Sequence, residues 1–140
     1  MHARIKWSEN AAFIGETGSG HAIVIDGPAE IGGRNLGPRP MELMLLSIGA
    51  CSSVDVVMIL KKGRQVIEDC YVEVSSVRAE TDPKVFTEIH LHFVITGKSL
   101  AENQVKRAVE LSAEKYCSAS IMLSKGGVKV THDYELRQTL

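Results

Sequence analysis

Two cysteines, Cys51 and Cys117, are the residues of this sequence that could perform covalent chemistry. Each lies in an apolar stretch with helical character, and steps of four residues place Cys117 on the same inward side as Val109 and Ala113. Packing of the two helices would bring the sulfurs close, and a disulfide would require α-carbons within about 7 Å. Two interpretations are open: both cysteines are small core residues, or they form a reactive pair.

The reactive interpretation is a thiol peroxidase. Attack on a peroxide requires a thiolate, and apolar surroundings raise the pKa of a thiol unless a cation or a donor offsets the desolvation. Arg34 and Arg39 precede the helix of Cys51, and Glu42 could orient a guanidinium through a bidentate pair. Cys51 would become a sulfenic acid, and Cys117 would resolve it as a disulfide. A pocket of leucines and methionines would favour a small apolar hydroperoxide.

The stretch from Pro38 to Gly63 predicts the helix that positions Cys51, over residues 41–62. Pro40 suits a first helical turn, and Gly63 suits a C-terminal stop. Apolar residues on every side predict a central helix that is buried all round. Because a chain of this length wraps such a helix poorly alone, we expect a second copy to help, in a homodimer.

A membrane span is the rival interpretation of this helix, since roughly 20 apolar residues cross a bilayer. Glu42 and Asp55 argue against it, because a charge in hydrocarbon costs about 2.5 kcal/mol or more. Asp55 falls one helical turn after Cys51 and would oppose its ionisation. A buried acid should have a partner, for which a basic group of the other subunit is one candidate.

The other segments predict an α+β domain that spans residues 1–140. Ala3, Ile5 and Trp7 alternate with polar residues, which is typical of a half-buried strand. The capping box Ser99-Leu100-Ala101-Glu102 predicts the start of a helix. We expect an N-terminal β-meander over 1–26, a loop over 27–40, an antiparallel hairpin over 66–96, a second helix over 99–117 and a last strand over 128–136.

Composition limits the partners. Sixteen basic and seventeen acidic residues give a net charge of -1, which offers no electrostatic grip on nucleic acid or lipid. Three cysteines without a CxxC pair are too few for a disulfide scaffold. The first ten residues lack the apolar core of a secretory signal, so we expect a cytoplasmic protein with reduced thiols and without nucleic-acid or membrane partners.

The blocks PRPMELMLLSIGACSSVDV and LSAEKYCSAS together resemble the OsmC-like family, which includes osmotically induced and organic hydroperoxide resistance proteins, and within it the YhfA-like branch. The resemblance implies an OsmC-like α+β fold, in which antiparallel sheets wrap two long central helices of an intertwined homodimer. It also implies that Cys51 matches the peroxidatic cysteine and Cys117 the resolving one. We expect a dithiol reductant, and no cofactor or metal.

The chain departs from the family pattern at three places. The catalytic glutamate of hydroperoxidase members usually lies where this chain has Met41, and Glu42 is about 100° away around a helix. The arginine of the organic hydroperoxide branch lies near the first hairpin, where this chain reads Ser8-Glu9-Asn10, so Arg34 and Arg39 are nominated as substitutes. Ser118 replaces the proline that often follows the second cysteine.

Two further features favour structural interpretations. His90 and His92 share one face of a strand at a spacing that could hold a metal, with His132 as a possible neighbour, but strand faces in solvent routinely carry histidines. Cys70 follows Asp69, whose charge disfavours a thiolate, and is assigned to packing.

The sequence therefore leads to two hypotheses. The first is a homodimeric, cysteine-based peroxidase that acts on organic hydroperoxides. The second is a non-catalytic dimer of the same fold that binds a small apolar ligand, with its cysteines used for packing.

Overall fold

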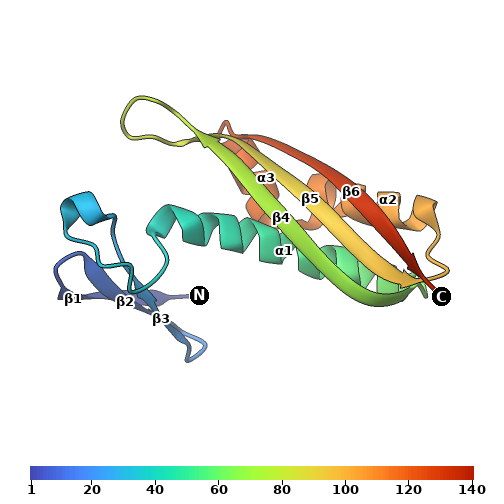
Figure 1. Ribbon diagram of the computed structural model, residues 1–140, viewed down its shortest axis with the longest axis horizontal. Helices are drawn as coiled ribbons and strands as arrows, with labels where there is room; N and C mark the ends of the chain where they lie inside the picture. The colour runs from blue at the N-terminus through green and yellow to red at the C-terminus, as the bar shows by residue number, and fades with distance from the viewer. The chain divides into compact units, whose positions relative to one another are not determined.

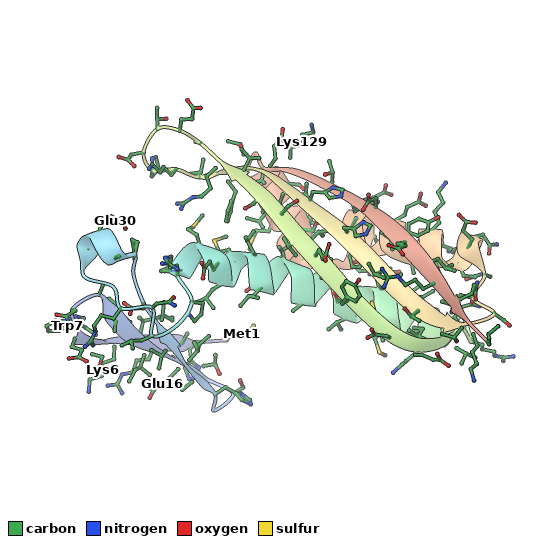
Figure 2. All side chains as sticks on the ribbon, viewed as in Figure 1. Met1, Lys6, Trp7, Glu16, Glu30 and Lys129 are labelled. Atoms are coloured by element: carbon green, nitrogen blue, oxygen red, sulfur yellow. The ribbon has the colours of Figure 1, made fainter.

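The computed structural model describes residues 1–140, which form two compact units, Met1–Leu46 and Ser47–Leu140. The first unit is built on a three-stranded antiparallel meander (Figure 1). Its strands are β1 (Ala3–Glu9), β2 (Ala12–Thr17) and β3 (Ala22–Ile25), paired in that order. Trp7, labelled in Figure 2, lies opposite Phe13 in the register of β1 and β2. The side chain of Trp7 is 62% exposed. An apolar face of this sheet is therefore open in the single chain.

Asp26 organises the loop that follows β3. Its buried carboxylate accepts hydrogen bonds from the backbone N–H groups of Gly27, Arg34 and Leu36, at 2.8, 2.9 and 3.2 Å. The Arg34 N–H is the largest cause that lowers the pKa of this carboxyl. A short 3-10 turn, η1 (Ala29–Ile31), lies inside the loop. One side chain thus fixes the path of the chain toward the central helix.

The central helix, α1 (Pro40–Lys62), is buried on one face only. Val54 and Met58, on other sides of α1, are 62% and 49% exposed. The single chain therefore covers one side of the helix, and burial of the other sides by a second copy stays a prediction. By length and composition α1 could cross a membrane, but core helices of soluble proteins pass the same test. The buried positions are Ile48, Gly49, Ser52, Val56 and Leu60.

The second unit contains one mixed sheet, with the order β4-β5-β6. The predicted antiparallel hairpin is confirmed as β4 (Val66–Arg78) and β5 (Phe86–Lys98). The last strand, β6 (Lys129–Thr139), runs parallel to β5 and begins at Lys129, labelled in Figure 2. The expectation of antiparallel sheets is wrong at this pair. The chain returns from β5 to β6 through a helical crossover, which is the connection that a parallel pair requires.

The core of this unit lies between one face of the sheet and its helices. Alternate residues of β5 face inward, the strands cross α1 obliquely, and α2 lies beside β6 (Figure 1). A Cβ added at Gly49 would lie 3.1 Å from Val74 and 3.4 Å from Val72. Glycine at this position therefore allows α1 to approach β4 closely. The inward residues of β5 are Ile89, Leu91, Phe93 and Ile95.

The second helix expected over 99–117 consists of α2 (Glu102–Leu111) and the π-helical turn η2 (Ser112–Tyr116). A separate short helix, α3 (Ser118–Lys125), follows it. The predicted capping box is wrong, because Ala101 is the N-cap of α2 and no side chain caps it. Two distant glutamines satisfy the backbone instead. Gln65 accepts the Ala101 N–H at 2.8 Å, and Gln138 accepts the Leu100 N–H at 3.1 Å and donates to its carbonyl at 2.8 Å.

Replacement of Gln138 tests this substitute for a cap. Gln138→Ala leaves the N–H and the carbonyl of Leu100 without these partners, so we expect a loss of about 1 kcal/mol in the free energy of unfolding. Urea unfolding at fixed protein concentration measures it. Gln104→Ala, an exposed control on α2, should change stability by less than about 0.5 kcal/mol. Equal losses in the two variants would contradict the assignment.

Candidate active site

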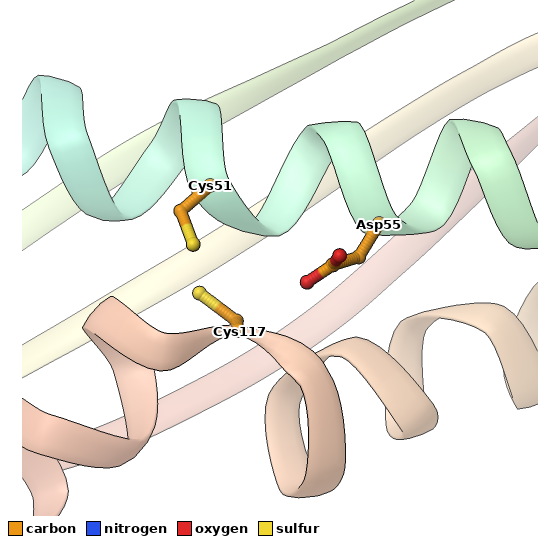
Figure 3. A group of neighbouring side chains, drawn as sticks. All are labelled: Cys51, Asp55 and Cys117. Carbon is orange, nitrogen blue, oxygen red and sulfur yellow. The ribbon is translucent and has the colours of Figure 1, made fainter.

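The structure brings Cys51 and Cys117 together. Cys51 projects from α1, Cys117 lies at the N-cap of α3, and their sulfurs point toward one another (Figure 3). The two sulfurs and a carboxylate oxygen of Asp55 all lie within 4.8 Å of one another. Both cysteines are free thiols; Cys51 is half-buried and Cys117 is fully buried. A covalent bond between the sulfurs would thus require only a small movement.

A break in the helical chain points Cys117 at α1. The N–H of Cys117 donates to the Ser112 carbonyl at 2.8 Å, which is the five-residue step of a π-helical turn. Cys117 itself is extended, with φ -70° and ψ 100°, and α3 begins after it. Its sulfur therefore takes the N-cap role that an oxygen usually has, and accepts the Ser120 N–H at 3.4 Å.

The thiol of Cys117 is held in its neutral form. Burial raises its pKa, and the neighbouring Cys51 raises it further. The Ser52 hydroxyl, which donates to the sulfur at 3.1 Å, and the Ser120 N–H oppose this without reversing it. Cys117 is consequently the weaker acid of the pair.

The thiol of Cys51 has the opposite character. Burial is the largest effect and raises its pKa, but three donors outweigh it, so that the pKa lies below the ordinary value. The donors are the Ala119 N–H, the Cys117 thiol and the Ser118 hydroxyl, whose oxygen lies 3.8 Å from the Cys51 sulfur. Two of them belong to the first turn of α3, where the helix dipole also favours negative charge. The N-terminus of α3 thus stabilises a thiolate on α1.

Asp55 works against this thiolate. Its charge raises the pKa of Cys51, and burial raises the pKa of its own carboxyl. The partner inside this chain is the Ser112 hydroxyl, at 3.5 Å, rather than a basic group. That hydroxyl has one proton and lies closer to the Ser52 carbonyl, at 3.1 Å, so Asp55 is only weakly hydrogen-bonded.

The other three predicted site residues all lie in the first unit. Arg34 forms an ion pair with Glu9, while Arg39 pairs with Glu42 at 3.4 Å. Glu42 also accepts the Arg39 backbone N–H at 3.1 Å, so it caps the start of α1. The groups that lower the pKa of Cys51 come from the second unit, and no arginine is among them. A role for Arg34, Arg39 and Glu42 at the thiols stays a prediction.

Sequence reasoning missed the residues that act on the two sulfurs. They are small residues that act through hydroxyl or backbone N–H groups. The segment Ser118-Ala119-Ser120 gave a usable signal, because serines are common at the start of a helix. The role of Ser52 had no such signal, because its hydroxyl meets Cys117 only when α1 and α3 pack together.

The histidines form a separate cluster on the outer face of the second sheet. His90 and His92 both contact Asp133 Oδ1, at 3.2 and 2.5 Å. His132 pairs in register with Leu91 and so faces the opposite side, which makes Asp133 rather than His132 their neighbour. Cys70 is half-buried, and burial followed by the charge of Asp69 raises the pKa of its thiol, in line with a packing role.

The chain is similar to known proteins along nearly its whole length. A family model for OsmC-like protein matches residues 32–133. Protein YhfA of Escherichia coli (strain K12) is 50% identical over 136 residues, which cover 97% of this chain and 98% of YhfA.

Solved structures show the same fold. A hypothetical protein from Aquifex aeolicus is 33% identical with a TM-score of 0.81, over 98% of this chain and 97% of that one. An organic hydroperoxide resistance protein OsmC from Legionella pneumophila shares the fold at 24% identity and a TM-score of 0.73, over 96% and 95% of the two chains. With its sequence match and its α+β fold, this chain belongs to the OsmC-like family.

Proposed function

We propose that this protein is a thiol-dependent peroxidase that reduces organic hydroperoxides, with Cys51 as the nucleophile and Cys117 as the resolving cysteine. One observation carries the proposal: a half-buried thiol with a lowered pKa faces a second, fully buried thiol. The names of solved relatives with this fold include organic hydroperoxide resistance, which supports the choice of substrate.

The reaction has two steps in this proposal. The Cys51 thiolate attacks the terminal oxygen of the hydroperoxide, the O–O bond breaks, and the alkoxide leaves as an alcohol after it takes a proton from solvent. Cys51 is then a sulfenic acid. The Cys117 sulfur attacks the Cys51 sulfur, the S–O bond breaks, and hydroxide leaves with the Cys117 proton as water. The disulfide that results is returned to two thiols by an external dithiol reductant.

The surroundings of the two sulfurs support this order of attack. The thiolate is the nucleophilic form, and the pKa of Cys51 is lowered whereas that of Cys117 is raised. Cys51 is also the more exposed of the two. A resolving thiol that stays neutral and buried until the sulfenic acid forms would limit side reactions of Cys117 with other oxidants.

An open hollow beside Ser118 is the place we propose for the body of the substrate. Its volume is about 530 Å³, within the range of small-molecule sites. Because the Ser118 hydroxyl contacts the Cys51 sulfur, a ligand in this hollow would lie next to the nucleophile. Its lining is mainly apolar and includes Tyr116, Ile121 and Met122, with the stems of Lys115 and Lys125.

We further propose that the protein works as a homodimer in the cytoplasm, where thiols stay reduced. Val54 and Met58 are exposed on α1, and Ile5 and Trp7 are 61% and 62% exposed on the N-terminal sheet. A second copy that covers these apolar groups would explain why α1 and the N-terminal sheet each expose apolar side chains in the single chain. In the dimer, Arg34, Arg39 and Glu42 are our candidates for groups that complete the peroxide site.

A second candidate function is non-catalytic binding of a small apolar ligand. One observation favours it: the charged group that acts on Cys51 within this chain is the Asp55 carboxylate, which opposes the thiolate. In this case the cysteines would serve for packing and the hollow beside Ser118 for binding.

Thiol oxidation separates the two candidates. We expect cumene hydroperoxide to consume the thiols of Cys51 and Cys117 and to form their disulfide, because the two sulfurs face each other. Peptide mapping with mass spectrometry identifies the bond. Cys51→Ser should reduce turnover to background, and Cys117→Ser should allow one oxidation of Cys51 without a disulfide. Cys70→Ser is the matched control and should turn over normally; persistence of both thiols in the unmodified protein would favour ligand binding.

The reaction rate should follow the ionisation of Cys51. Because its pKa lies below the ordinary value of 9.0, the rate of Cys51 alkylation should rise with pH and level off earlier than for a free thiol. Asp55→Asn removes an opposing charge and should move this profile to lower pH, whereas Ser118→Ala removes a donor and should move it to higher pH. Alkylation with iodoacetamide at a series of pH values gives the profiles. Ser124→Ala, an exposed change on α3, should leave the profile in place, and shifts in the reverse directions would refute the assigned causes.

The dimer proposal is tested by charge on the open face of α1. Met58→Glu should convert a species with the mass of two chains into one with the mass of a single chain, because it would bury a charge against the second copy. Sedimentation velocity measures the mass. Val85→Asp, at a residue 53% exposed between β4 and β5, is the control and should remain dimeric. A single-chain mass for the unmodified protein would reject the dimer.

A further inference from the structure

A carboxylate beside the two thiols is a feature that the peroxidase reaction leaves unexplained. The Cys51 sulfur, the Cys117 sulfur and an Asp55 oxygen converge within 4.8 Å of one another (Figure 3). The Asp55 carboxylate repels a thiolate on Cys51, and no cation of this chain is among the groups that act on Cys51. A divalent cation would convert this repulsion into attraction.

We propose that the reduced protein binds one Zn²⁺ ion through Cys51, Asp55 and Cys117. Zinc accepts thiolate and carboxylate ligands together, whereas Mg²⁺ and Ca²⁺ require all-oxygen sites. Two sulfurs that bind one tetrahedral zinc at about 2.3 Å lie about 3.8 Å apart. The limit of 4.8 Å on the separation of the three atoms accommodates that spacing with small side-chain movements.

The backbone holds the three ligands on firm elements. Cys51 and Asp55 are one turn apart on α1 and therefore share a face, while Cys117 is fixed by the N-cap of α3. Hydrogen bonds to the ligands are already in place. Ser52 and the Ser120 N–H donate to the Cys117 sulfur, so they would stabilise it as a metal-bound thiolate.

The number of ligands indicates an exchangeable ion. Structural zinc sites have four protein ligands, whereas three leave a position open for water or another ligand. The open position suits zinc that binds and leaves, rather than zinc that holds the fold together. The ion would also occupy both thiols, so it would block their oxidation by a hydroperoxide. This consequence rests on the proposed peroxidase activity, but zinc binding itself does not.

The outer cluster of His90, His92 and Asp133 is the competing zinc ligand set on this chain. Its residues lie on the opposite face of the sheet from the core, and Asp133 is exposed. The test must therefore separate the two sets, for which His92→Ala is the control.

Zinc titration of the reduced, full-length protein against a chromophoric chelator tests the proposal. We expect one zinc per chain, with affinity lowered by at least about tenfold in Asp55→Asn and further in Cys51→Ser and Cys117→Ser. Cys70→Ser and His92→Ala should bind as tightly as the unmodified protein. Asp55→Asn nearly preserves the size of the side chain, and circular dichroism checks that each variant is folded.

Cobalt(II) supplies a readout that needs no variant. Cobalt bound at this site should give a thiolate charge-transfer band in the near ultraviolet, and oxidation of Cys51 and Cys117 to the disulfide by diamide should abolish both the band and zinc binding. Absence of the band, binding that survives diamide, or binding lost in His92→Ala and kept in Asp55→Asn would each overturn the proposal. Diamide is used instead of a hydroperoxide, so a protein without peroxidase activity still gives a decisive result.

Discussion

The contact of the first turn of α3 with the middle of α1 is the interaction on which the site depends. A thiol inside a protein resists ionisation, because burial removes the water that would solvate its charge. The Ala119 N–H, the Cys117 thiol and the Ser118 hydroxyl replace part of that solvation at Cys51, and together they exceed the effect of burial. The same contact buries Cys117 and raises its pKa, so one packing arrangement gives two thiols with opposite acidities.

An irregular backbone makes this contact possible. A regular helix from α2 through Cys117 would carry the second sulfur along the axis of α2, without the free N–H groups of a new helix start. The π-helical turn at Ser112–Tyr116 and the extended residue Cys117 end the first helix and begin α3. The start of α2 is held in turn by Gln65 and Gln138, which lie on either side of it in the sequence. The site is thus assembled from segments that the sheet brings together.

Asp55 gives the site a possible metal ligand in addition to its two thiols. For a peroxidase its charge is unfavourable, since it raises the pKa of Cys51. For a cation it is the hard ligand that complements two soft ones. The weak hydrogen bond from Ser112 leaves the carboxylate available for either role. The two proposals fit together: peroxide would oxidise the thiol pair to a disulfide, and zinc would bind the reduced pair together with Asp55.

The sequence by itself indicated the α+β fold and the central helix, because apolar patterns are local properties of the chain. Its resemblance to the OsmC-like family came from the two blocks around Cys51 and Cys117, and the family model confirms it. The predicted ends of the central helix, 41 and 62, lie within one residue of those of α1 (Pro40–Lys62). Proline and glycine restrict or relax the backbone at their own positions, so their effect on a helix end can be predicted locally. Only the tertiary structure decided which donors meet Cys51, that β6 runs parallel to β5, and that glutamines replace the predicted cap at Ser99. The physical reason is that hydrogen bonds between distant segments depend on how helices pack on the sheet, and no local pattern records that packing.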